Sequence, residues 1–193
     1  MNALEQRMVD ALKDLKENHD VLGVKAEFEA EGTRMEEALR LKEVVTKAGL
    51  DLTIKIGGCE AIRDMYDARS IGVTRIVAPM IETPYAMHKF IGATHMVYPE
   101  DEWSSVDFLI NIETETGYRN FEKMMELKES EQLAGIVLGR TDMSRSLGLT
   151  ADDINCDQVF RLASDLLPKA KKTGMRDRRW CIGRIGAFFR PFA

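Results

Sequence analysis

The sequence lacks the cysteine and histidine spacing that a disulfide framework or a zinc site requires. Its three cysteines, Cys59, Cys156 and Cys181, are an odd number, lie far apart and form no CxxC pair. The three histidines form no HExxH pattern. We therefore expect reduced thiols in a cytoplasmic protein, and neither a disulfide-linked domain nor a zinc site.

Long apolar runs and an excess of positive charge are also missing. No stretch approaches the ~18 apolar residues of a membrane span, and residues 1–20 have the pattern of an amphipathic helix instead of a signal peptide. The formal net charge of −5 argues against nucleic acid or an anionic membrane as the main partner. No GxGxxG follows the first predicted strand and no GxxxxGK[ST] is present, so nucleotide binding of either kind is not indicated.

The sequence does contain a repeated alternation of strand and helix patterns. Strands are predicted at 24–29, 52–56, 74–82, 106–113 and 133–139, with a short additional strand at 95–99. Helices are predicted at 33–49, 59–72, 83–93, 116–129 and 156–174. Such alternation predicts an α/β fold with a parallel sheet and helices outside it. Periodicity alone fits both an open doubly wound sheet and a (β/α)₈ barrel.

Charged residues stand where the predicted strands end, which is where parallel α/β folds place their ligand sites. Glu113 and Asp142 end strands that are one strand–helix–strand repeat apart. Neighbouring parallel strands lie ~4.8 Å apart, so these carboxylates would repel unless a cation lay between them. This predicts an Mg²⁺ or Mn²⁺ site with Glu113 and Asp142 as ligands. The alternative is that each carboxylate merely caps a helix or lies in a solvated loop.

Two segments, INIETETGYRNFEKMMEL and LAGIVLGRTDMSRSLGL, closely resemble the HpcH/HpaI aldolase/citrate lyase family. The likeness extends to RIVAPMIETPYAM and covers about residues 20 to 173. Glu113 in NIET corresponds to the family's metal-binding glutamate and Asp142 in GRTDMS to its metal-binding aspartate. The resemblance implies a (β/α)₈ barrel, a divalent metal, and a carbon–carbon lyase or aldolase that acts on a pyruvate-like keto acid or an acyl-CoA substrate.

The resemblance also implies roles for the residues around this pair. Lys55 stands where the family usually has an arginine that stabilises the developing oxyanion, although a strand-end lysine can also simply extend to solvent. Backbone amides of Gly139, Arg140 and Thr141 correspond to the loop that holds the substrate carboxylate. Arg140 replaces the usual proline there, and either faces a second acidic group of the substrate or points into solvent.

The chain departs from the family where aldolases carry a DGEH motif. Gly32 stands at the position of the histidine that serves in acid/base chemistry. Glu29 or Glu31 could replace it as a catalytic base if burial raised its pKa. Otherwise both are solvated loop carboxylates.

The C-terminal tail differs from the rest of the chain. Residues 1–174 form the predicted barrel domain with its N-terminal helix, whereas residues 175–193 are rich in arginine and aromatics and show no regular period. A barrel usually needs ~250 residues, so we expect it to be incomplete, with its last strands missing or altered. Read one base out of frame, the tail can encode a segment that resembles the family's next strand. We hypothesise a single-base frameshift near Arg176, which genomic DNA would test; the alternative is a divergent tail.

Two hypotheses about function follow. The first is a divalent-metal-dependent carbon–carbon lyase or aldolase that acts on a 2-keto acid, and the paired carboxylates favour it. The second is a catalytically impaired, truncated barrel that binds a small acid or a partner chain, and the missing histidine and unusual tail favour it. Because members of the family commonly self-associate, we also expect a homo-oligomer.

Overall fold

Strands and helices alternate along the chain in the computed structural model, which describes residues 1–173, 175, 179–183 and 187–189. The strands are β1 (Val21–Glu27), β2 (Asp51–Lys55), β3 (Arg75–Ala78), β4 (Asp107–Ile112), β5 (Gly135–Gly139), β6 (Arg179–Gly183) and β7 (Ala187–Phe189). The helices are α1 (Ala3–His19), α2 (Met35–Lys47), α3 (Ile62–Ile71), α4 (Pro84–Val97), α5 (Glu100–Trp103), α6 (Glu115–Met125), α7 (Arg140–Ser146) and α8 (Asp157–Lys171). Two 3₁₀ helices, η1 (Lys128–Gln132) and η2 (Ala151–Asn155), complete the set.

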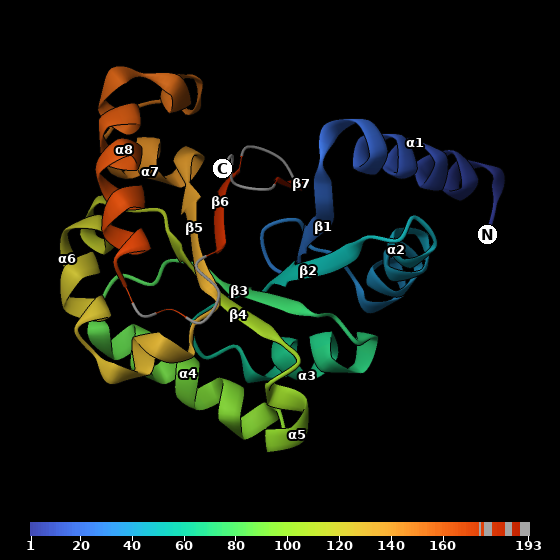
Figure 1. The fold of residues 1–193 in the computed structure, drawn as a ribbon, viewed down its shortest axis with the longest axis horizontal. Coiled ribbons are helices and arrows are strands. Elements are labelled where there is room, and N and C mark those ends of the chain that lie inside the picture. The colour runs from blue at the N-terminus through green and yellow to red at the C-terminus, as the bar shows by residue number, and fades with distance from the viewer. Residues whose placement is uncertain (174, 176–178, 184–186, 190–193) are drawn as a thin grey trace.

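The strands form one sheet in the order β6-β5-β4-β3-β2-β1-β7. Strands β1 to β6 run parallel, and β7 pairs with β1 in the antiparallel direction. Figure 1 shows the sheet curling upon itself, with the helices outside the curve. The predicted α/β class is confirmed. The described residues form part of a barrel of the expected kind, and not a complete (β/α)₈ ring.

The two faces of the sheet have different compositions because side chains alternate along each strand. The outer face supplies large aliphatic residues that the helices bury, including Ile54, Ile76, Ile110 and Ile136. The inner face has a smaller apolar cluster of Val77, Leu109 and Val137 at its middle. Charged residues lie on the inner face at both ends of the strands, so the concave side is polar where a ligand could approach.

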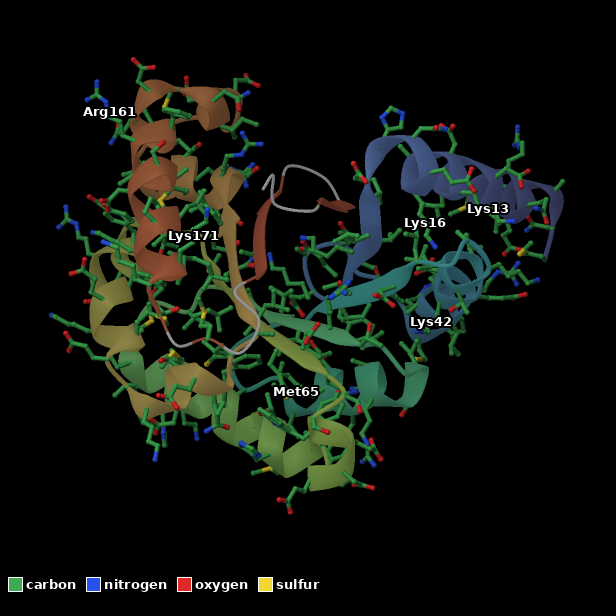
Figure 2. All side chains as sticks on the ribbon, in the orientation of Figure 1. Lys13, Lys16, Lys42, Met65, Arg161 and Lys171 are labelled. Atoms are coloured by element: carbon green, nitrogen blue, oxygen red, sulfur yellow. The ribbon has the colours of Figure 1, made fainter. Side chains whose placement is uncertain are left out.

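Lysines link successive helices around the outside of the sheet. Lys16 of α1 donates to the carbonyl of Gly49, 2.8 Å away, just beyond the end of α2. Lys42 of α2 donates in the same way to the carbonyl of Gly72, 2.9 Å away, at the end of α3. Figure 2 shows both lysines on their helices. A cation at a helix C-terminus also interacts favourably with the helix dipole, so these contacts join each helix to the next.

One predicted strand is wrong, one is displaced, and the predicted strand 74–82 is shorter, since β3 ends at Ala78. Residues 95–99 do not form a strand, because α4 continues to Val97 and the buried ring of Tyr98 packs edge-on against Phe108 with centroids 5.3 Å apart. The first strand spans Val21–Glu27 instead of 24–29, so Glu27 is its last residue. The predicted start of α4 is confirmed, since the Thr83 hydroxyl accepts a hydrogen bond from the backbone N–H of Ala86 at 3.1 Å.

The last two strands fall within the segment 175–193. Strand β6 continues the parallel sheet beside β5, with Gly135 opposite Arg179. Arg176, the point of the hypothesised frameshift, lies outside the described residues, and that hypothesis stays a prediction. Among the described helices, none has the length and apolar character needed to cross a bilayer.

Candidate active site

Glu113 is a buried carboxylate just after the end of β4, with 2% of its surface exposed. Its Oε1 accepts a hydrogen bond from the backbone N–H of Met80 at 2.9 Å, and its Oε2 accepts one from Asn111 Nδ2 at 2.8 Å. The cap of α6 is instead Thr114, whose hydroxyl accepts from the N–H of Gly117 at 3.1 Å. The capping interpretation of Glu113 is therefore wrong. The carboxylate is held on the inner face of the sheet.

The backbone of Met80 is unusual because its φ of 46° lies in the left-handed region. A residue other than glycine pays ~1–2 kcal/mol for this conformation. The Met80 side chain is 54% exposed, so its burial does not explain the strain. The strained turn places the Met80 N–H against Glu113, which indicates that the fold favours a fixed carboxylate at this point.

Gly139 leaves the space that the Glu113 side chain occupies. A Cβ at position 139 would lie 2.5 Å from Oε2 of Glu113 and 2.6 Å from its Cβ, closer than real contacts allow. A side chain at 139 and the observed position of Glu113 therefore exclude each other. Sequence reasoning assigned Gly139 to a substrate cradle, whereas the structure shows it first as the residue that admits Glu113.

Asp142 lies in the first turn of α7, half-buried, and brings a second negative charge to Glu113. Burial raises the pKa of Glu113 above its ordinary value, and Asp142 raises it further. Lys55 and the two amide donors act in the opposite direction without offsetting this rise. Gly139 occupies the cap position of α7, so Asp142 is not an N-cap either. The two predicted carboxylates thus lie within electrostatic reach of each other.

Lys55 ends β2 and joins the same group of charges. Its Nζ lies 3.8 Å from Oε2 of Glu113 and 3.4 Å from Oε2 of Glu27. Only 12% of the Lys55 side chain is exposed, so the interpretation of a lysine extended to solvent is wrong. Lys55 is therefore a cation held beside the buried carboxylate, where the resemblance places one.

Glu27, at the end of β1, is a member of this group that sequence reasoning missed. It is 8% exposed, and its Oε1 pairs with the Nζ of Lys25 while its Oε2 faces Lys55. Burial opposes its charge, but the two lysines outweigh burial and hold the pKa of Glu27 below its ordinary value. The sequence pattern that could have identified Glu27 is the alternation in VLGVKAE, which places Lys25 and Glu27 on one face of the strand.

Glu29 and Glu31 lie in the exposed loop after β1, and their carboxylates are not paired with the charged groups of this cluster. Oε2 of Glu31 accepts a hydrogen bond from the backbone N–H of Glu27 at 3.2 Å. The Glu29 carboxylate lies beside Gly57, where an added Cβ would be 3.2 Å from Oε2. Within the described part of the chain, no hydrogen bond or ion pair joins either residue to Lys55 or Glu113. The burial that a catalytic base would require is absent at both positions.

Arg140 and Thr141 begin α7 directly after Gly139. Nη1 of Arg140 donates to Oδ1 of Asn155 at 2.7 Å and so ties α7 to η2. Its Nε is buried and finds no partner among the described residues. The guanidinium is thus held by the protein itself and does not extend freely into solvent. Thr141 is half-buried beside it.

Comparisons with known proteins give one family match and several solved structures of similar fold. The sequence model of the HpcH/HpaI aldolase/citrate lyase family matches residues 29–177. No curated protein matches the chain in sequence. Citrate synthase SbnG is similar in structure, with a TM-score of 0.74, 16% identity, and coverage of 93% of this chain and 73% of that one.

Two further solved structures are similar in the same way. An HpcH/HpaI aldolase/citrate lyase family protein from Burkholderia cenocepacia gives a TM-score of 0.70 at 16% identity, covering 93% of this chain and 83% of that one. An HpcH/HpaI aldolase from Desulfitobacterium hafniense gives 0.70 at 13% identity, covering 89% and 72%. At such low sequence identities the structural similarity shows only a shared fold. Evidence for a family relationship comes from the match to the sequence model.

Proposed function

Since the chain belongs to the HpcH/HpaI aldolase/citrate lyase family, we propose that it is a divalent-metal-dependent carbon–carbon lyase. Family membership indicates an aldolase- or citrate-lyase-type reaction. The proposed substrate is a 2-keto acid that reacts through a pyruvate-like enolate, or a related acyl-CoA. The observation that supports this best is Glu113, a buried carboxylate within electrostatic reach of both Asp142 and the Lys55 ammonium.

The side chains present fit a hard divalent cation. Burial and the neighbouring charge of Asp142 both oppose ionisation of Glu113, and a cation between the carboxylates would offset both effects. Among the described residues, no cluster of three or more His, Cys, Asp or Glu could hold a metal. The protein would therefore supply two carboxylates, Glu113 and Asp142, and leave the other positions to water and substrate, as Mg²⁺ sites often do.

In this proposal the residues around the carboxylates bind and stabilise the substrate. When bound, a divalent cation supplies Lewis-acid polarisation of a keto oxygen. The Lys55 ammonium stabilises the negative charge that develops on that oxygen as the enolate forms. The backbone amides of Gly139, which precedes α7, and of Arg140 and Thr141, which begin it, hold the substrate carboxylate. Because lysine lacks the flat, forked shape of arginine, it stabilises charge without fixing the substrate in two places.

Proton exchange at the methyl group of pyruvate tests this function. We expect the wild-type chain with Mg²⁺ or Mn²⁺ to exchange these protons for deuterium in D₂O, which proton NMR follows as loss of the methyl signal. Oxalate, which mimics the enolate, should inhibit the exchange. Glu113→Gln should reduce the rate at least ~100-fold, the order expected when a group that supports the transition state is lost. Glu36→Gln, an exposed carboxylate of α2, is the matched control and should exchange like the wild type.

The outcomes separate the two hypotheses. Metal-dependent exchange that Glu113→Gln abolishes supports the lyase. Oxalate binding with no exchange under any metal would overturn the lyase in favour of a barrel that only binds a small acid.

A further inference from the structure

Four charged side chains form a row across the inner face of the sheet, with alternating sign. Lys25 and Glu27 come from β1, Lys55 from β2 and Glu113 from the end of β4. On the intervening strand β3, the residue opposite Lys55 is the apolar Val77. At that register β3 therefore offers Lys55 no polar side chain.

Lys55 lies closer to Glu27 than to Glu113. Its Nζ is 3.4 Å from Oε2 of Glu27 but 3.8 Å from Oε2 of Glu113, which is too long for a hydrogen bond. The short hydrogen bonds of Glu113 come instead from Met80 and Asn111, at 2.9 and 2.8 Å. Glu113 and Lys55 thus stand near each other without forming a tight ion pair.

We propose that Glu27 is a positioning residue that holds Lys55 off Glu113, and so leaves the Glu113 carboxylate available to a divalent cation. This inference rests on the proposed function, because it assumes that Glu113 is a metal ligand. Lys25 completes the arrangement, since its ammonium pairs with the other oxygen of Glu27 and keeps that buried carboxylate charged. Neither Glu27 nor Lys25 touches the reacting atoms in this role.

The physical reason is competition between two cations for one carboxylate. Without Glu27, the largely buried ammonium of Lys55 would have Glu113 as its remaining acidic neighbour among the described ion pairs. An unpaired buried charge is strongly unfavourable, so Lys55 would close on Glu113 to the ~2.8 Å of a charge-assisted hydrogen bond. A divalent cation would then have to displace it.

Mn²⁺ binding, measured by electron paramagnetic resonance of the free ion, tests the inference without any need for turnover. We expect Glu27→Gln to weaken Mn²⁺ binding about tenfold, the order expected when a unit charge moves by ~1 Å at an effective dielectric constant of about 20. Glu36→Gln on α2 removes an exposed carboxylate and should leave the binding constant unchanged.

A double-mutant cycle separates positioning from a simple loss of negative charge near the metal. If Glu27 acts through Lys55, then Glu27→Gln has no effect on Mn²⁺ affinity in a Lys55→Gln background. If the two losses instead add, Glu27 acts directly by its charge and the inference is wrong. A circular dichroism melt of each variant checks folding. Should Glu27→Gln fail to fold, Glu27→Asp takes its place in the cycle, with a smaller weakening that must also vanish without Lys55.

The failure of this inference can be told from failure of the proposed function. Wild-type protein that binds no Mn²⁺ would overturn both. Wild-type protein that binds Mn²⁺ as tightly as Glu27→Gln does would overturn the role of Glu27 alone.

Discussion

Gly139→Ala is the sharpest perturbation that the site offers, because it adds one methyl group against Glu113. The Cβ would lie 2.5 Å from Oε2 and 2.6 Å from Cβ of Glu113, so one of the two residues must move. The backbone at 139 has φ −86° and ψ 95°, which alanine adopts without strain. Any effect therefore comes from the contact and not from the backbone conformation.

The magnitude follows from what Glu113 would lose. Overpacking of this kind costs ~2 kcal/mol, and for a domain of this size that lowers Tm by about 4–8 °C. If Glu113 moves to make room, its hydrogen bonds from Met80 and Asn111 lengthen as well. Because the carboxylate then leaves its place near Asp142, we expect Mn²⁺ affinity to fall at least ~10-fold, or about 1.4 kcal/mol.

The matched control is Gly92→Ala, a glycine inside α4 with nothing within 4 Å of an added Cβ. It should stabilise the protein by ~0.5–1 kcal/mol, because alanine favours helix more than glycine, and leave Mn²⁺ binding unchanged. Calorimetry and titration of the three proteins give both quantities. If Gly139→Ala has the melting temperature and the Mn²⁺ affinity of the wild type, then Glu113 does not lie against residue 139. The arrangement of the site described above would then be wrong.

Three other predictions follow from particular contacts. Burial raises the pKa of Glu113 above its ordinary value of 4.5, so the stability it contributes at low pH is lost as pH rises through the raised value. Metal-free Glu113→Gln should therefore be more stable than the wild type at neutral pH, and urea titrations should show this difference shrinking as pH falls from the raised value towards 4.5 and levelling off below it. Thr83→Ala removes the cap of α4 and should cost ~1 kcal/mol in the same titrations with unchanged Mn²⁺ binding. Phe108→Ala removes a buried ring that contacts Phe90, Tyr98 and Trp103 and should cost ~3–5 kcal/mol, seen as a large fall in the urea midpoint.

The general form of the fold could be predicted because its signals are local. Each outer-face aliphatic run is followed within a few residues by a helical pattern, so the alternation is visible without tertiary information. The segment 95–99 was misassigned because a short apolar run fits both a strand and a buried helix end. Only the packing of Tyr98 against Phe108 decides between them, and that contact joins residues from different elements.

The nearness of the two carboxylates could be predicted because the spacing places Glu113 and Asp142 just after two adjacent strands, β4 and β5. The role of Gly139 could not be predicted from the sequence. Gly139 makes room for the Glu113 side chain, and this close approach is visible only in the folded structure. Glu27 was missed for a different reason. The predicted first strand ends two residues too late, at Glu29, which alternates to the same face as Glu27 but lies beyond the sheet.

Because the first strand ends at Glu27, the absence of the family's histidine counts less against the proposed lyase than the sequence suggests. A residue that replaced this histidine directly would itself have to exchange protons. The structure instead places a charged pair, Lys25 and Glu27, at the strand end, where it acts on Lys55 through a salt bridge. A site whose cation is a lysine needs such a partner more than one built on arginine, because an ammonium on a flexible stem has no fixed orientation of its own. If Glu27 acts through Lys55 in this way, the double-mutant cycle would detect the coupling of the two residues as non-additivity.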